Sequence, residues 1–236
     1  AATPGRHEEE TYRGLAADRR VDGVILSDLR ADDPRIDLVA SLGIAAVTLG
    51  VPDVDSPFTS VSVDDGAGIR LAVDHLADLG HTDIAHVAGP FAMLHGRHRA
   101  AAFEDAARAR GIRARVIETD FSAADGARAT TALLDAEIPP TAIVYSNDNM
   151  AVAGLGTAQR RGLSVPRDLS ITGFDDTELG RHLFPALTSV STDARGWGAA
   201  AARALLQAIA GGEPEALALA DPGLQVRDST APPTRS

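Results

Sequence analysis

The sequence of 236 residues contains no cysteine and no lysine. Without cysteine it can form no disulfide bond and no thiolate metal site, and it offers no cysteine nucleophile, which favours a cytoplasmic location. Without lysine it cannot supply the Gly-Lys-Ser or Gly-Lys-Thr loop that cradles phosphates, and no Gly-x-Ser-x-Gly nucleophile turn occurs either. The sequence therefore shows no catalytic apparatus of these kinds.

Long apolar runs are also missing. The longest alanine-rich run, residues 198–212, is interrupted by Arg203 and Gln207 and is too short to cross a bilayer, so we expect an amphipathic helix there and no contact with a membrane. Apolar residues make up 44% of the chain and charged residues 23%, which is typical of a globular protein and excludes wholesale disorder, collagen and coiled coil.

The charge balance is acidic. The 22 basic residues, all arginines, are outnumbered by 33 acidic ones, which gives a formal net charge of −11. A surface with this charge opposes a phosphate backbone and cannot gain the counterion-release energy that drives nucleic-acid binding. We therefore do not expect these residues themselves to bind DNA or RNA.

Short apolar runs alternate with longer segments of helical periodicity, such as Ile69 to Leu79 and Ala129 to Leu134. Strand, helix and strand at this spacing predict βαβ units, whose right-handed crossovers give a parallel sheet covered by helices on both faces. The predicted fold class is therefore α/β. The expected strands are residues 21–26, 45–49, 60–63, 84–88, 114–117, 142–145 and 169–172.

Small and polar residues gather where these runs end. Gly89–Pro90 follows the fourth expected strand, Glu118–Phe121 the fifth, Ser146–Asn149 the sixth, and Phe174–Thr177 the seventh. The carboxyl ends of the strands of an open parallel sheet share one edge, and ligands bind there. These loops are where we expect the function of the protein to lie.

A series of motifs covers nearly the whole chain. They are Val21–Ile25, Asp64–Asp65 with Gly68, Ala72–Leu76, Leu79–His81, Ile84–Pro90, Arg99 with Phe103, Asn147–Ala151, Arg161–Gly162, Val165–Ile171, Gly173–Asp176 and Leu187–Val190. In this order and spacing the chain resembles the effector-binding core of the LacI/GalR family of bacterial transcription regulators. The resemblance implies a periplasmic-binding-protein-like fold, in which two lobes of parallel sheet and flanking helices bind an effector in the cleft between them.

Members of that family begin with a helix-turn-helix DNA-binding domain, a hinge helix and a first strand, helix and strand, and none of these precedes Val21. We therefore expect a chain without the DNA-binding head and with an incomplete N-terminal lobe. The family topology implies that residues 1–63 and 193–214 form the N-terminal lobe, and that residues 64–192 and 215–236 form the C-terminal lobe.

Three side chains are the strongest candidates for effector contacts. By the resemblance, Arg99 hydrogen-bonds effector hydroxyls or carboxylates, because a planar guanidinium can hold two oxygens at once. The alternative is a solvated arginine beside Arg97. Asp175 and Asn147 occupy family positions that accept or donate hydrogen bonds to a sugar or base. The alternative for both is the N-cap of a helix, since aspartate and asparagine are favoured there.

Phe121 lies just past a strand, at a family position that forms a platform for the apolar face of a sugar ring. The alternative is packing within its lobe. Thr192 and His95 match family positions that touch the effector. Asp148, next to Asn147, is expected to be a cap or a structural residue.

No pattern indicates a metal or a cofactor. His75, His81 and His86 are spaced for neither one helix face nor one loop, so we expect no metal site. Gly154–Gly156 lacks a third glycine and falls inside a predicted helix, so a dinucleotide fingerprint is not supported.

The leading hypothesis is an effector-sensing, homodimerising core of a cytoplasmic regulator, a repressor, that binds a small sugar or polyol, with a purine as the other candidate. Operator DNA would be bound by a domain outside this chain. The alternative is an extracytoplasmic sugar-binding protein of an ABC importer, which shares the fold. A third hypothesis, a hydrolase or nucleoside-processing enzyme using Asp148, Asp175 and Asp176, lacks a nucleophile or metal, so we expect no enzyme.

Overall fold

The computed structural model describes residues 4–234, which form two compact units. Of the described residues, the first unit comprises 4–63 and 193–220, and the second comprises 64–192 and 221–234. The expected lobe boundary after residue 214 lies too early, because β9 (Ala216–Ala218) pairs with β3 (Thr59–Ser62) and so belongs to the first unit. The chain ends that the expected lobes include, residues 1–3 and 235–236, lie outside the described residues.

The first unit contains a parallel sheet in the order β1 (Gly23–Leu26), β2 (Ala45–Leu49), β3 and β9, and α8 (Ala194–Ile209) packs on it. Val47 and Val61 of this sheet pack against alanines of α8, where small side chains allow the helix to approach closely. The indole N–H of Trp197, also in α8, donates a hydrogen bond to the Val61 carbonyl oxygen at 3.0 Å. The other helices of this unit are α1 (Pro4–Ala17) and α2 (Pro34–Ser41).

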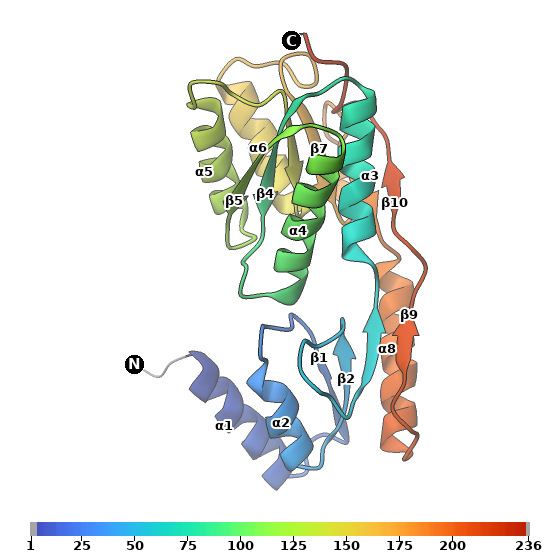
Figure 1. The fold of residues 1–236 in the computed structure, drawn as a ribbon. Helices are drawn as coiled ribbons and strands as arrows, with labels where there is room; N and C mark the ends of the chain where they lie inside the picture. The colour runs from blue at the N-terminus through green and yellow to red at the C-terminus, as the bar shows by residue number, and fades with distance from the viewer. Residues whose placement is uncertain (1–3, 235–236) are drawn as a thin grey trace. The chain divides into compact units, whose positions relative to one another are not determined.

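The second unit contains a sheet in the order β10-β8-β7-β6-β4-β5, in which only β10 runs antiparallel to its neighbour (Figure 1). Its strands are β4 (Asp83–Ala88), β5 (Arg113–Glu118), β6 (Ala142–Tyr145), β7 (Ser170–Phe174), β8 (Thr188–Ser191) and β10 (Gly223–Gln225). Its helices are α3 (Asp65–Asp78), α4 (Leu94–Ala109), α5 (Ala123–Leu134), α6 (Asp148–Arg160) and α7 (Glu178–Arg181). The α/β prediction is confirmed, and all seven expected strands form; β8, β9 and β10 were not predicted.

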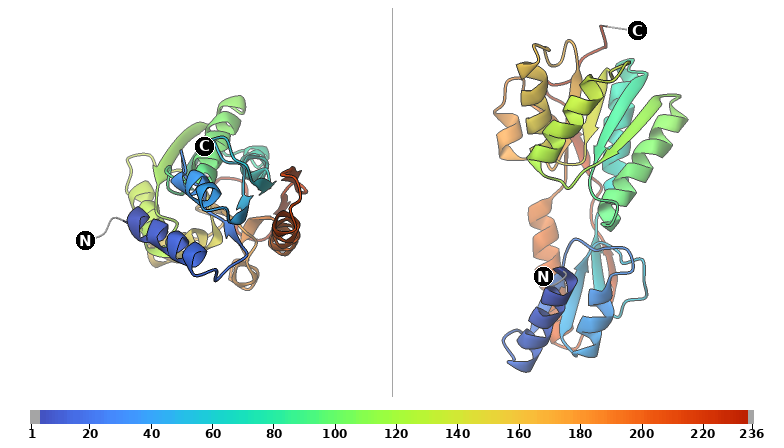
Figure 2. Two further views of the ribbon diagram at one scale, coloured as in Figure 1. Left: turned by 90° about the horizontal axis from the view of Figure 1, so that it is seen from below. Right: turned by 90° about the vertical axis from the view of Figure 1, so that its left-hand side faces the viewer.

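Helices cover both faces of the second sheet, as Figures 1 and 2 show. Along β4, Ile84 packs in a cluster with α3 and α4, whereas Ala85 and Val87 pack in a cluster with α5 and α6. Along β6, Val144 joins the first cluster and Tyr145 the second. Successive side chains of a strand point to opposite faces, so apolar runs without alternation predict the doubly covered sheet that is found.

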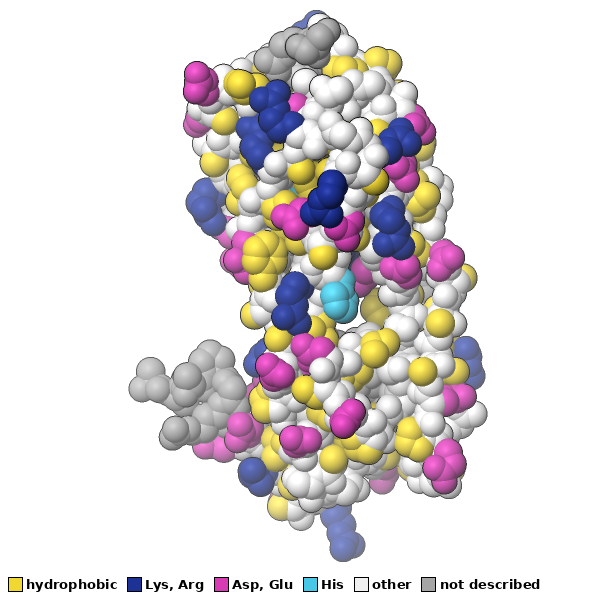
Figure 3. Space-filling view, viewed as in Figure 1, with side chains coloured by type: hydrophobic (Ala, Val, Ile, Leu, Met, Phe, Trp, Pro, Cys, Tyr) yellow, Lys and Arg dark blue, Asp and Glu magenta, His cyan; other side chains and the backbone are white. Residues whose placement is uncertain are grey.

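Charges of both signs are interspersed over the face of the molecule shown in Figure 3, where arginine side chains lie close to acidic ones. Among residues 4–234, no helix has the length and apolar character needed to cross a membrane.

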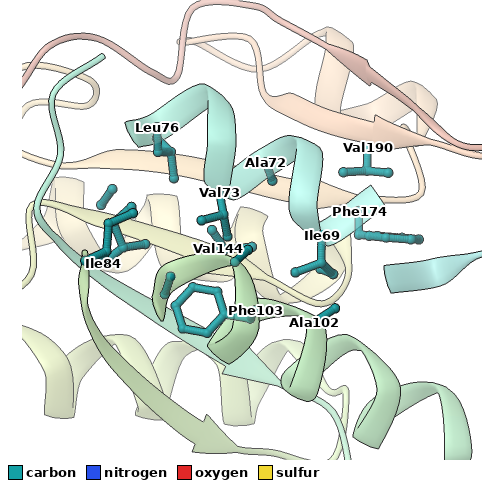
Figure 4. Packing of buried hydrophobic residues seen from close by; sticks show 14 residues of the cluster. Ile69, Ala72, Val73, Leu76, Ile84, Ala102, Phe103, Val144, Phe174 and Val190 are labelled. Carbon is teal, nitrogen blue, oxygen red and sulfur yellow. The ribbon is translucent and has the colours of Figure 1, made fainter. Parts of the chain in front are cut away.

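Figure 4 shows the cluster of buried apolar side chains between the sheet, α3 and α4. Phe103 of α4 is fully buried beside Val73 and Val144, and its ring also stacks on the imidazole of His86, with 4.9 Å between the ring centroids. Phe174, the last residue of β7, belongs to the same cluster. This core therefore holds the last residue of β7, and with it the start of the loop that follows the strand.

Candidate functional site

The six residues predicted to bind an effector all lie in the second unit. They follow strands that run parallel, so their loops meet at one edge of the sheet, which we call the carboxyl edge. They are His95 and Arg99 in α4, Phe121 after β5, Asn147 after β6, Asp175 after β7 and Thr192 after β8.

Arg99 is buried and is held from three sides. Its Nη1 donates to the carbonyl oxygen of Ser146 at 2.6 Å, and its Nη2 donates to Oδ1 of Asp65 at 2.8 Å. Its guanidinium carbon lies 3.7 Å from the centroid of the Phe174 ring, which is a cation–π contact. The side chain is therefore no solvated arginine. A rigid, paired guanidinium at the end of β6 and β7 is preorganised to present a positive charge at the carboxyl edge.

Asp175 lies at the surface beside this arginine, in a crowded setting. Desolvation by the surrounding protein raises the pKa of its carboxyl to about 6, although the Arg99 guanidinium acts to lower it. The carboxylates of Asp148 and Asp65 raise this pKa further. Close to neutral pH the group can therefore exchange between an ionised acceptor and a neutral donor.

The backbone at Asp175 and Asp176 is unusual. Their φ angles are 109° and 49°, in the region that side-chain-bearing residues rarely adopt. The carboxylate of Asp176 pairs with Arg181 at 2.7 Å and with Arg227 at 2.5 Å. Asp176 thus anchors its own loop, while Asp175 is the member of the pair whose pKa the Arg99 guanidinium lowers.

Phe121 and His95 form a stacked aromatic pair. Their ring centroids are 5.2 Å apart and their planes differ by 7°. The tip of the Phe121 ring lies against the backbone of Gly89, because a Cβ at that position would fall 1.9 Å from Cζ of the ring. The Phe121 backbone has a φ of 67°. The structure thus brings two of the predicted residues together at the carboxyl edge. Phe121 also packs against the apolar cluster that contains Ala85 and Val87, which is the alternative weighed from the sequence, so its role as a platform for a sugar stays a prediction.

Asn147 is the N-cap of α6, since its Oδ1 accepts from the Met150 N–H at 2.8 Å. Its Nδ2 donates to the carbonyl oxygen of Phe121 at 3.0 Å. The cap and the effector contact, weighed as alternatives from the sequence, are not exclusive, because one amide hydrogen is left for a third partner. Effector binding by Asn147 stays a prediction.

Thr192 lies directly after β8. This strand pairs with β7, the strand that Asp175 follows. Within the described part of the chain, no hydrogen bond or ion pair joins it to the other five residues. Its contact with an effector also remains a prediction.

Sequence reasoning missed Asp65 and Phe174, which hold Arg99 in place, and it gave Asp148 only as a cap or a structural residue without its partners. Asp65 carries the charge opposite Arg99, Phe174 supplies the ring under its guanidinium, and Asp148 hydrogen-bonds to the loop after β7. Asp65, Phe174 and Asp148 all lie inside motifs noted above, but a motif does not show which partner a side chain meets.

The histidines singled out in the sequence have structural partners. His81 hydrogen-bonds to Thr141, and His86 to the carbonyl oxygen of Val144 at 2.9 Å. Burial lowers the pKa of His86 to about 4, so this ring is neutral at pH 7. Among the residues that the structure describes, no group of three or more histidine or acidic side chains is placed to hold a metal ion.

The amino-acid sequence of this chain is similar to those of known proteins. A family described as a periplasmic binding protein-like domain matches residues 73–230. The chain is 33% identical over 230 residues to the HTH-type transcriptional regulator CelR of Thermobifida fusca, a match that covers 94% of this chain and 67% of the relative.

Solved structures of transcriptional regulators are also similar to this chain. A LacI family transcriptional regulator from Bifidobacterium animalis matches with a TM-score of 0.89 and 35% identity, over 96% of this chain and 84% of that one. A complex of the regulator CelR with cellobiose matches with a TM-score of 0.87 and 33% identity, over 94% and 70%. A dimeric Lac repressor matches with a TM-score of 0.85 and 32% identity, over 98% and 86%.

Proposed function

Because this chain belongs to the LacI family of transcriptional regulators, as the motif resemblance predicted, we propose that the carboxyl edge of its second unit binds a small sugar or polyol as the effector. The chain is the effector-binding core of such a regulator. The similar proteins are regulators rather than binding proteins of importers, which speaks against the alternative interpretation.

The observation that carries the proposal is that Asp175 and the buried Arg99 lie at the same edge of the sheet, near enough for the guanidinium to lower the pKa of the Asp175 carboxyl. A carboxylate accepts hydrogen bonds from sugar hydroxyls, and a guanidinium donates to hydroxyl and ring oxygens. Both groups are already held by protein contacts, so an effector does not have to order them on binding.

The aromatic platform favours a sugar within this chemistry. A pyranose has an apolar face of C–H groups that packs on an aromatic ring, and such a contact contributes about 1 kcal/mol beyond its buried area. The CelR protein similar to this chain was solved with cellobiose. A purine would use the same ring by stacking, and it is the other class to be tested.

The effector is bound rather than converted in this proposal. The described residues contain no group that could hold a metal, and the carboxylates of Asp148 and Asp176 are occupied by structural donors. Catalysis by paired carboxylates would need a second carboxylate beside Asp175 that can reach the substrate, and Asp148 and Asp176 are both bound to protein donors instead.

Operator binding is assigned to a DNA-binding domain of the full regulator, acting as a homodimer in the cytoplasm. The acidic balance of this chain opposes DNA, and a similar Lac repressor was solved as a dimer. The effector can change operator affinity only by its difference in affinity for the two states of the regulator.

The test is a thermal-shift and calorimetry screen of cellobiose, lactose, maltose, ribitol and hypoxanthine on this chain. We expect a disaccharide to raise the Tm and Asp175→Asn to weaken its binding at least tenfold. Asp105→Asn, an exposed carboxylate on α4, is the matched control and should leave affinity unchanged. Binding of hypoxanthine alone, or full affinity in Asp175→Asn, would overturn the proposal.

A further inference from the structure

Asp148 is the first residue of α6, yet its carboxylate does not cap that helix. The cap is Asn147. The side chain of Asp148 is buried and turns to the neighbouring strands, where it accepts three hydrogen bonds. The donors are the Thr177 backbone N–H at 2.7 Å, the Thr177 hydroxyl at 2.9 Å and the Ser189 hydroxyl at 2.6 Å.

These donors flank the strained pair Asp175–Asp176 on both sides. The Ser189 Oγ, held by Asp148, also accepts the backbone N–H of Asp176 at 3.1 Å. Thr177 follows the pair directly and is fixed to the same carboxylate. Two successive non-glycine residues at positive φ are strained, and such strain persists only where the surroundings over-determine it.

The space around the carboxylate of Asp148 is shaped for it. A Cβ at Gly173 would fall 2.1 Å from its Oδ1, and one at Gly180 would fall 3.5 Å from its Oδ2. Burial raises the pKa of Asp148, against the hydrogen bonds from Ser189 and Thr177, which lower it. A buried carboxylate with three donors is therefore a fixed part of this loop rather than a group that reaches a ligand.

Asp148 and Asp175 are also close to each other. The carboxylate of Asp148 acts on Asp175 as a like charge, and the Asp148 backbone N–H acts on it as a hydrogen-bond donor. The other charged groups that act on Asp175 are Arg99 of α4 and Asp65 of α3. The position and the protonation of Asp175 are thus both linked to Asp148.

We propose that Asp148 is a positioning residue for effector recognition: its carboxylate holds the loop 175–177 in the strained conformation that presents Asp175 at the carboxyl edge, and it touches no effector itself. This inference rests on the proposed function, in which Asp175 contacts the effector.

The test compares Asp148→Asn with wild type by NMR of the whole chain without effector. The asparagine keeps the size of the side chain, but its NH₂ group must face donors that the carboxylate accepted. We expect the amide signals of residues 175–177 to shift or broaden in the variant, while the signals of β4 and β6 in the core remain as in wild type. The pKa of Asp175 should also differ from its wild-type value. Asp37→Asn, in the first turn of α2, controls for the helix dipole and should change none of these.

Binding of cellobiose, lactose and maltose gives the second arm. For a sugar that binds, Asp148→Asn should lower affinity about as much as Asp175→Asn, and the double variant should lose little more, because both changes remove one interaction. Full affinity in Asp175→Asn would refute the proposed function. Loss in Asp175→Asn, with full affinity and an unchanged loop in Asp148→Asn, would refute only the role of Asp148.

Two milder variants keep the inference falsifiable if Asp148→Asn does not fold. Ser189→Ala removes one hydroxyl donor and Thr177→Val another, and both leave the carboxylate in place. We expect each to disturb the signals of residues 175–177 and to lower sugar affinity by a smaller factor. If none of the three sugars binds, an undisturbed loop in these variants still overturns the inference, and a disturbed loop supports it.

Discussion

Effector affinity should depend on pH through Asp175. The pKa of its carboxyl is about 6, because the surrounding protein desolvates it more than Arg99 compensates. At pH 7 about 90% of such carboxyls are ionised, and at pH 5 about 10%. If the ionised form accepts the sugar hydroxyls, the apparent Kd should rise about tenfold between these two values.

The assay is calorimetry of the best disaccharide from the screen, at half-unit steps from pH 5 to 8. The sugar itself does not titrate in this range, so any dependence comes from the protein. Asp175→Asn is the control: its weaker affinity should vary much less with pH than that of wild type. An affinity that is flat from pH 5 to 7, or a profile equally steep in Asp175→Asn, would refute the reasoning.

The same group should act on stability with the opposite sign. A carboxyl whose folded pKa is raised, here from 3.8 to about 6, binds more protons in the folded than in the unfolded state between those values. Its contribution to the free energy of unfolding is therefore largest below pH 3.8 and is lost as pH rises to about 6. The difference in Tm between wild type and Asp175→Asn, followed over this window, measures it.

Three further predictions concern the contacts around the site. Arg99→Lys keeps the positive charge, but a lysine cannot hydrogen-bond to Ser146 and Asp65 while it stacks on Phe174. Urea unfolding should therefore show that the free energy of unfolding falls by about 2–4 kcal/mol. A fall below about 0.5 kcal/mol would contradict this account. Gly89→Ala should displace the Phe121 ring, because the added Cβ would overlap it. Calorimetry should then show sugar binding weakened several-fold, with little change in Tm. Unchanged binding would show that the ring is no platform for the sugar. Asn147→Asp keeps the oxygen that caps α6 but loses the N–H that donates to the Phe121 carbonyl oxygen. Sugar affinity should therefore fall, while the helix content measured by circular dichroism remains unchanged. Equal affinity in the variant and wild type would leave Asn147 with the role of a cap only.

The strand pattern and its edge could be predicted because both follow from local features. Apolar runs of four to six residues gave the strands of the second sheet, and the direction of parallel strands placed the residues after them at one edge. β8 was missed because Thr188–Ser191 has a single large apolar side chain, Val190, and forms a strand only by pairing with β7 and β10. β9 was missed for a similar reason, and with it the place where the chain leaves the first unit.

The sequence by itself determined which polar residues gather at the carboxyl edge, since that depends on where each strand stops. Only the tertiary structure decided what each of them does there. Arg99 meets Asp65 from a helix 34 residues earlier, and Asp148 reaches Thr177 and Ser189 across two strands. Such partners are set by how helices pack on the sheet, and no local pattern encodes the direction in which a side chain points. The left-handed backbone of Asp175 is likewise held by distant hydrogen bonds against its own preference.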